Sequence, residues 1–250
     1  MKTSHCIQHH AAALLMALAV SSITTHASVP SGPPVFTTPL NISNTYQPFQ
    51  PGAIKVFTGT DHLETAASVD LYLTETRTFS VGGKAVECHV LQEVNFVGGA
   101  LVESTFNYFA QADDGTVYYF GEVVNTYENG VLVGHHGSWL VGGPTLAGDP
   151  PETANASVPA VFMPANPEVG DMFKPEDLFP IVDETDEVLA TGKKLRVPAG
   201  RFTGVISIRE STQLDTTTER KWYAPGVGAI QARAVGELLQ LTASTLMPTN

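Results

Sequence analysis

The stretch AVECHVLQEVNFVGGALVESTFNYFAQADDGTVYYFGEVVN, residues 85–125, decides the fold of this chain. It contains three strand-length runs in which apolar and polar side chains alternate, as they do along a strand with one buried face. Gly98-Gly99 separates the first two runs, and Asp113-Asp114-Gly115 separates the last two. Both are turn sequences that join neighbouring strands. The stretch therefore predicts an antiparallel meander.

Strand-like runs also flank this stretch on both sides. Residues 70–81 precede it, and residues 131–141 follow it across Asn129-Gly130, a pair that favours a type I′ hairpin turn. A Pro-rich crossing then covers residues 142–180, with one short turn of helix expected around residues 175–178. Beyond it, strand-like runs resume at residues 186–197, 201–212, 219–224, 227–235 and 237–244. The sequence predicts an all-β fold, an antiparallel meander that forms a curved sheet or a complete or half barrel, with a long Pro-rich crossing loop.

The N-terminus reads as a secretory signal peptide. Lys2 precedes a short apolar run, and the small residues Thr25 and Ala27 suit cleavage near Ala27. The apolar run is shorter than the roughly 20 residues that span a bilayer, so we expect no transmembrane segment. The signal predicts a secreted or periplasmic protein.

The predicted domain layout follows from these boundaries. Residues 1–27 are the signal peptide, and residues 28–52 are a leader rich in Pro, Ser and Thr. Residues 53–250 form a single β domain. Within it, we expect a first meander over 53–141, the irregular crossing over 142–180 and a second set of strands over 181–245.

Charge and cysteine content exclude several classes of function. Lys2 is the only charged residue in the predicted signal, so the processed chain has 12 bases against 25 acids, a formal net charge of −13. Such a surface repels nucleic acid and anionic membranes, so we expect no nucleic-acid partner. Cys88 is the only cysteine after the signal, and a single cysteine forms no internal disulfide.

The motif GHHGSW, residues 134–139, raises the question of a metal site. His135 and His136 are consecutive in a predicted strand, so their rings point to opposite faces and share a metal only if a bulge intervenes. Cys88 and His89 diverge in the same way, which predicts a buried Cys88 and a solvated His89. The acidic stretch 167–188 favours a solvated loop over a weak calcium site. We expect neither a metal nor a cofactor.

The turns predict a register for the first meander. The expected pairs are Arg77–Cys88, Phe79–Val86, Val94–Glu103, Phe96–Leu101, Asn107–Gly121, Phe109–Tyr119, Phe120–Trp139 and Val123–His136.

With this register, one face collects apolar side chains with polar ones among them. The apolar members are Leu71, Leu73, Phe79, Val86, Val90, Val94, Phe96, Leu101, Phe109 and Val123, and Gln92 and Thr105 also lie on this face. Our candidate ligand-binding residues are the remaining polar members, Glu75, Arg77, Glu103, Asn107 and His136. One interpretation is structural: Glu75 pairs with Arg77 two residues away, and the others reach solvent at strand ends. The other is a concave sheet face with an apolar cavity and a few polar groups, as small-molecule sites usually have.

Several turn motifs carry a resemblance. LRVPAGRF at residues 195–202, the segment TTTERKWYAPGVGAIQ at 216–231, YFAQADDGTVYYFGE at 108–122 and GSWLVGG at 137–143 resemble secreted bacterial proteins of unknown function. The resemblance covers Asp70 to about Leu241. In architecture alone, the meander also looks like lipocalin or lipoprotein-carrier half-barrels, whose concave faces hold apolar ligands. That likeness concerns the fold and does not fix the function.

Three functions remain open at this point. The first is a non-enzymatic protein that binds a lipid or another apolar or amphipathic ligand, or a cell-envelope partner, in its concave sheet face. The second is a hydrolase or lyase in which Glu103 and His136 act as acid and base around the same cavity. The third is a structural envelope component without a pocket.

Overall fold

The computed structural model describes residues 29–248, so the predicted signal peptide lies outside the described residues. Within this range the chain forms strands and turns but no helix, which confirms the all-β prediction. Between Val29 and Pro248 there is also no helix of the length and apolar character that a membrane crossing requires. The strands are β1 (Ile54–Asp61), β2 (Glu64–Val81), β3 (Lys84–Val97), β4 (Ala100–Gln111), β5 (Val117–Glu128), β6 (Val131–Gly134), β7 (Trp139–Val141), β8 (Ala154–Ala156), β9 (Ala160–Met163), β10 (Met172–Leu178), β11 (Val182–Val197), β12 (Gly200–Ser211), β13 (Thr218–Ala224), β14 (Gly228–Ala234) and β15 (Glu237–Ser244).

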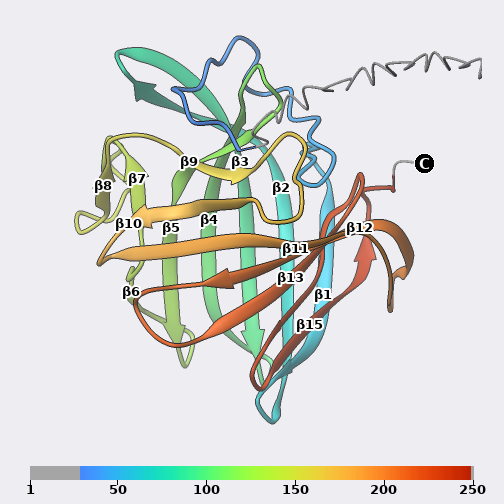
Figure 1. Ribbon diagram of the computed structural model, residues 1–250. Coiled ribbons are helices and arrows are strands. Elements are labelled where there is room, and N and C mark those ends of the chain that lie inside the picture. Colours follow the sequence, from blue (N-terminus) through green and yellow to red (C-terminus); the bar gives the residue numbers. More distant parts are fainter. Residues whose placement is uncertain (1–28, 249–250) are drawn as a thin grey trace, which may run out of the picture.

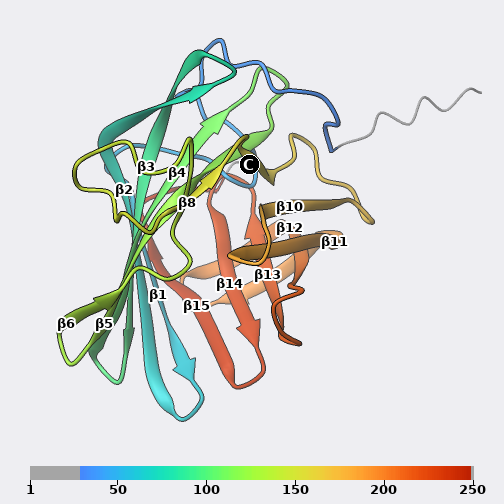
Figure 2. The same ribbon diagram turned by 90° about the vertical axis from the view of Figure 1, so that its left-hand side faces the viewer.

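All of these strands belong to one sheet that rolls into a nearly closed barrel (Figure 1). The first wall consists of β1 to β5 in chain order, and the second wall consists of β10 to β15, of which β10 and β11 run across the first wall (Figure 2). Antiparallel pairing of β1 with β15 joins the two walls. On the opposite side β9 pairs with β5 and contacts β10. The inner faces of both walls are therefore enclosed.

Turn chemistry explains why the first wall is a meander. Gly82-Gly83 joins β2 to β3 with φ angles of 56° and 79°, and Gly98-Gly99 joins β3 to β4 with φ angles of 58° and 82°, as type I′ turns require. Asn129 and Gly130, with φ angles of 51° and 77°, join β5 to β6 in the same way. The predicted pairs Arg77–Cys88, Phe79–Val86, Phe96–Leu101 and Phe109–Tyr119 are all present. Cys88 is buried, as predicted.

A β-bulge near the turn between β3 and β4 changes the predicted register. Phe96 lies opposite Leu101 as expected, but the register then shifts, and Asn95 rather than Val94 lies opposite Glu103. Because successive side chains point to opposite faces, this one-residue slip exchanges the faces of β4 relative to β3. The predicted inner face is therefore wrong, since it combines the outer side of β2 and β3 with the inner side of β4.

A second bulge, between β4 and β5, also departs from the predicted register. Asn107 lies opposite Glu122 rather than Gly121, and Trp139 pairs with Glu122 rather than with Phe120. The shift brings the Glu122 carboxyl onto the same face of the sheet as the Asn107 amide.

The predicted strand over residues 131–141 is interrupted in the structure. A turn that holds His135 and His136 separates β6 from β7, and Gly137 takes a φ of 90°, a conformation that favours glycine. The predicted pairing of Val123 with His136 is therefore wrong, and His136 is exposed.

The Pro-rich crossing contains three strands that the sequence did not indicate. The turn of helix expected around residues 175–178 is wrong, because these residues form the end of β10. β9 pairs with β5 and β10 pairs with β11, so the crossing carries the chain from the first wall to the second.

The predicted leader packs onto the barrel from residue 29 to residue 52. Ile42 and Phe49 are buried, and the Phe49 ring stacks on the His89 ring with 4.3 Å between centroids. A ring nitrogen of His89, Nε2, lies 2.9 Å from the Leu40 carbonyl oxygen. The prediction of a solvated His89 is wrong because the leader covers this side chain.

Candidate functional site

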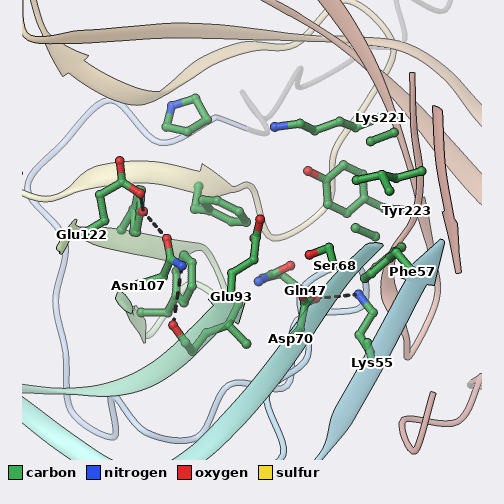
Figure 3. A pocket seen from close by; sticks show the side chains of 18 of the residues that line it. Gln47, Lys55, Phe57, Ser68, Asp70, Glu93, Asn107, Glu122, Lys221 and Tyr223 are labelled. Carbon is green, nitrogen blue, oxygen red and sulfur yellow. Dashed lines mark hydrogen bonds and ion pairs between the residues drawn. The ribbon is translucent and has the colours of Figure 1, made fainter. Parts of the chain in front are cut away.

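A cavity of about 330 Å³ lies inside the barrel, between the two walls (Figure 3). Its volume is at the lower end of the range for small-molecule sites. Gln47 reaches it from the leader, and the other lining residues come from both walls and from the crossing. The aromatic part of the lining consists of Phe57, Tyr72, Phe109, Tyr119, Phe162 and Tyr223.

The polar part of the lining is strongly acidic. Six carboxyl side chains and two lysines give it a formal charge of −4 when all are ionised: Asp70, Glu93, Glu122, Glu176, Glu184 and Glu219, with Lys55 and Lys221. Ionised groups removed from water are costly unless they are paired or hydrogen-bonded. The arrangement of these groups therefore decides what the cavity can hold.

Lys55 and Asp70 form a buried pair on the first wall. They face each other across β1 and β2, and Lys55 Nζ lies 3.6 Å from Asp70 Oδ2. Burial lowers the pKa of Lys55 although Asp70 opposes this, and burial raises the pKa of Asp70 to about 7 although Lys55 opposes that. Both shifts favour the neutral forms. Glu93 lies opposite Asp70 on the next strand and extends the row into the cavity.

Glu122 and Glu176 form an acid pair where the first wall meets the crossing. Burial, and then the charge of Glu176, raise the pKa of Glu122 well above its usual range, and burial also raises the pKa of Glu176. The two carboxyls are hydrogen-bonded to each other, and Trp139 Nε1 donates to Glu176 Oε1 at 3.3 Å.

The hydroxyl of Tyr119 connects this acid pair to Asn107. It forms hydrogen bonds with Asn107 Oδ1 and, at 3.0 Å, with Glu122 Oε2. One phenolic proton cannot serve both acceptors at once, so a proton held on Glu122 satisfies the arrangement. The raised pKa values of Glu122 and Glu176 favour protonated carboxyls, and two neighbouring carboxyl groups of this kind can supply acid and base roles.

Lys221 is the main cation of the second wall. Its Nζ forms ion pairs with Glu210, with Glu219 at 3.6 Å and with Glu184 at 3.9 Å. Burial alone would lower the pKa of Lys221, but the three carboxylates raise it well above its usual range. Burial raises the pKa of Glu184 and Glu219 even so. One ammonium group is therefore shared by several carboxyls.

Two groups of residues in the described range 29–248 bring three potential metal ligands together. Glu184, Asp186 and Glu210 place one carboxylate oxygen each within 4.8 Å of the others, between β11 and β12. The second group is Asp61, His62 and Glu237, at the turns that follow β1 and β14.

The predicted site residues do not come together. Asn107 lines the cavity, as described above. Glu103 is half-buried and accepts hydrogen bonds from Thr105 Oγ1 at 3.0 Å and Asn95 Nδ2 at 3.4 Å, and burial raises its pKa. Glu75 is exposed on β2, where Thr74 Oγ1 donates to it at 3.4 Å. His136 is exposed in its turn, so Glu103 and His136 do not face one cleft. A binding role for these side chains stays a prediction.

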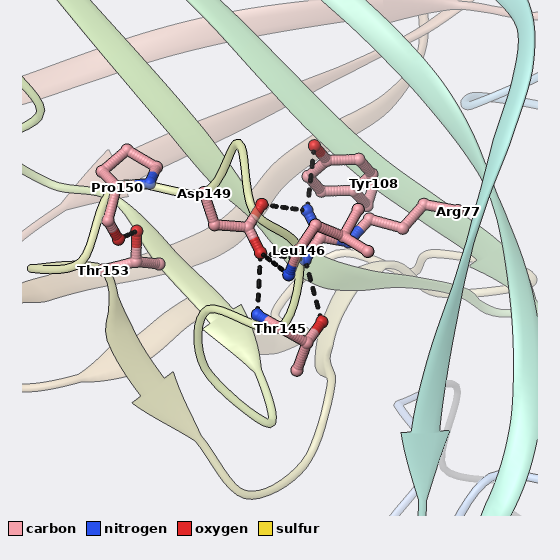
Figure 4. Close-up of polar contacts among 7 residues, drawn as sticks. All are labelled: Arg77, Tyr108, Thr145, Leu146, Asp149, Pro150 and Thr153. Carbon is pink, nitrogen blue, oxygen red and sulfur yellow. Dashed lines mark hydrogen bonds and ion pairs between the residues drawn. The ribbon is translucent and has the colours of Figure 1, made fainter.

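Arg77, the remaining predicted site residue, is buried and holds the loop around residues 145–149 in place through an ion pair (Figure 4). Its two terminal nitrogens lie 2.8 and 2.7 Å from the Asp149 carboxylate, and one of them lies 3.4 Å from Tyr108 Oη. Asp149 also accepts backbone N–H groups of Thr145 and Leu146. The neighbouring Thr76 pairs with His89, which pairs with the cavity residue Phe109, so Arg77 points away from the cavity.

Most of the carboxyl residues that line the cavity were not among the site residues predicted from the sequence. Asp70 and Glu93 are not among the residues of the predicted apolar face, which followed the side of β2 and β3 that points away from the cavity. Lys55 lies on a strand that was not predicted individually. Glu176 and Glu184 belong to the acidic stretch that was interpreted as a solvated loop. No local signal marked the inward-facing carboxyls, because the acidic residues at the start of Val182–Val197 come in adjacent pairs, Asp183-Glu184 and Asp186-Glu187, and do not alternate with apolar residues.

Comparison with known proteins identifies no relative of this chain. No protein-family model matches the chain, and no curated protein and no solved structure matches it either. The cavity and its charges are therefore the features that bear on function.

Proposed function

We propose that this is an exported binding protein that holds a small amphipathic organic cation, such as an amine with an apolar body, inside its barrel. The observation that carries the proposal is a cavity of about 330 Å³ whose lining combines six carboxyl groups with aromatic rings. Export is supported by the signal-like N-terminal sequence. An amphipathic ligand is favoured over a wholly apolar one because an apolar ligand would leave the carboxylates desolvated without partners.

Two kinds of attraction favour a cation in this cavity. The lining has a formal charge of −4 when all its groups are ionised, and a cationic ligand stabilises the ionised carboxylates by reducing their mutual repulsion. Rings of Tyr72, Phe109 and Tyr223 also line the cavity, and a cation over an aromatic face gains roughly 0.5–2 kcal/mol. We expect the ammonium group of the ligand to pair with Glu93. This residue lies opposite Asp70, and within the described range 29–248 no lysine lies at ion-pair distance from it.

A matched series of probes tests the proposal. We expect 2-phenylethylamine to bind, and 2-phenylethanol and phenylacetate to bind at least about tenfold more weakly, a difference of about 1.4 kcal/mol. Trp139 donates to Glu176 at the cavity, so binding is followed by tryptophan fluorescence and by calorimetry. Glu93→Gln should weaken amine binding, whereas Glu152→Gln, at an exposed position, should not. Equal binding of all three probes would contradict the proposal.

A second candidate, a hydrolase or lyase, is favoured by the Glu122–Glu176 acid pair next to the Tyr119 hydroxyl. Native mass spectrometry of the protein purified from its own host identifies any molecule that copurifies. Incubating that molecule with the protein then separates the two functions. A carrier leaves its mass unchanged, whereas an enzyme changes it and loses this activity in Glu122→Gln. A structural envelope component would bind neither the copurified class nor the amine probe.

A further inference from the structure

A row of carboxylates crosses three neighbouring strands of the second wall. Asp186 on β11 lies directly opposite Glu210 on β12, and Glu210 lies directly opposite Glu219 on β13. Glu184 lies two residues from Asp186 and therefore on the same face. Like charges directly opposite each other destabilise a sheet, so this row needs a positive charge to hold it.

Lys221 supplies only part of that charge. It forms ion pairs with Glu184, Glu210 and Glu219, but within the described residues it forms none with Asp186. Four carboxylates against one ammonium leave a formal charge of −3 in this cluster.

Asp186 is the member of the cluster that lacks a partner. The residue is 2 % exposed, and its Oδ1 atom is buried without a hydrogen-bond partner in the described part of the chain. Native proteins seldom leave a buried carboxylate oxygen unsatisfied, so such an atom points to a ligand that completes the site. Burial also raises the pKa of Asp186 to about 7; Lys221 opposes this shift, and the charges of Glu210 and Glu219 add to it.

We propose that Glu184, Asp186 and Glu210 bind a divalent cation, with Ca²⁺ as the best-matched ion. Oxygen-only carboxylate ligands select hard cations, and Ca²⁺ accepts irregular geometry with waters in the remaining positions. Ca²⁺–O distances of about 2.3–2.6 Å allow two ligands of one ion to lie up to about 5 Å apart. The oxygens here lie within 4.8 Å of one another, which satisfies that limit. A bound dication reduces the formal charge of the cluster from −3 to −1.

The cluster is reachable from two sides. Glu184 and Glu219 line the barrel cavity, and Glu210 and Glu219 also line a second cavity of about 440 Å³ next to the loop between β12 and β13. Water from either cavity can complete the coordination of the ion. The site uses a different set of residues from the amine site around Glu93, and it does not require the proposed organic ligand.

The second group of potential metal ligands, Asp61, His62 and Glu237, lacks these features. His62 and Glu237 are exposed, and His62 Nδ1 already lies 2.7 Å from Asp61 Oδ1. No buried atom without a partner belongs to this group within the described range. We expect no specific ion there.

Calorimetric titration of the full-length protein with CaCl₂, after dialysis against EDTA, tests the proposal. We expect one Ca²⁺ per chain, with Asp186→Asn and Glu210→Gln each weakening binding at least tenfold and the matched control Asp61→Asn leaving it unchanged. Circular dichroism confirms that each variant is folded. Absence of Ca²⁺ binding by the unmodified protein, or loss of binding in Asp61→Asn but not in Asp186→Asn, would overturn the proposal.

A second variant tests the position of the ion. Lys221→Met removes the ammonium group that competes for the same carboxylates, so Ca²⁺ should bind at least tenfold more tightly. Unchanged Ca²⁺ affinity in this variant would place the ion elsewhere and would refute the site. The amine titration is carried out in EDTA, so failure of either proposal is seen independently of the other.

Discussion

The Asp186→Asn substitution removes a buried charge while almost preserving the shape of the side chain. The pKa of Asp186 in the folded protein is about 7, whereas an unperturbed Asp side chain titrates near about 3.9. Between these two values the folded state holds a proton that the unfolded state has released. The contribution of this group to stability is therefore present at low pH and is lost as the pH rises through 7.

The size of the effect follows from the two pKa values. Between pH 5 and pH 8, ionisation of Asp186 lowers the free energy of unfolding by roughly 2–3 kcal/mol. Asn does not titrate, so the variant should lack this part of the pH dependence. The stability difference between pH 5 and pH 8 should therefore be smaller by roughly 2–3 kcal/mol in Asp186→Asn than in the unmodified protein.

Urea unfolding at both pH values, in EDTA and followed by tryptophan fluorescence, measures this difference. Asp114→Asn is the matched control, because Asp114 is exposed in the turn before β5. An Asp186→Asn variant with the pH dependence of the unmodified protein would refute the reasoning. An equal change in Asp114→Asn would refute it as well, because the effect would then not depend on burial.

Two further predictions concern the packing of the barrel. Arg77→Met should lower the free energy of unfolding by about 3–5 kcal/mol, because it leaves the Asp149 carboxylate, whose side chain is 5 % exposed, without its partner. The double variant with Asp149→Asn should lose less than Arg77→Met alone in the same urea assay, and a larger loss would argue against this role of the ion pair. Gly121→Ala should cost about 3 kcal/mol or more, because Gly121 has a φ of 113° and an added Cβ would lie 2.1 Å from the Trp139 carbonyl oxygen. Gly148→Ala, with no atom within 4 Å of the added Cβ, should change the melting temperature little, and similar losses in both variants would contradict this explanation.

Most of the long strands were predictable from the sequence because local signals determine them, whereas β1 and the three strands of the crossing were not. Alternation of apolar and polar side chains marks β3 and β4, and the turn residues Gly98-Gly99 separate them. The predicted pair Phe79–Val86 is present for the same reason, since it lies close to a tight turn.

The candidate site was not predictable in the same way, because register decides which side chains face the cavity. The slip that puts Asn95 opposite Glu103 involves one residue, and Val102 at that point resembles any other strand residue. The burial of His89 depends on Phe49, which lies in a segment without strand character. Such contacts between distant parts of the chain leave no local pattern.

The pairing of β1 with β15 has a consequence for the order in which the chain assembles. Lys55 lies opposite Ser244, so the seam joins segments from nearly opposite ends of the described chain. Until the last strand is in place, β1 is an edge with unpaired backbone groups, a feature that favours association with other chains. Contacts of such large sequence separation also form slowly. A newly made molecule therefore passes through an open, aggregation-prone state before its final strand seals the barrel, and a chaperone that shields this edge would raise the yield of folded protein.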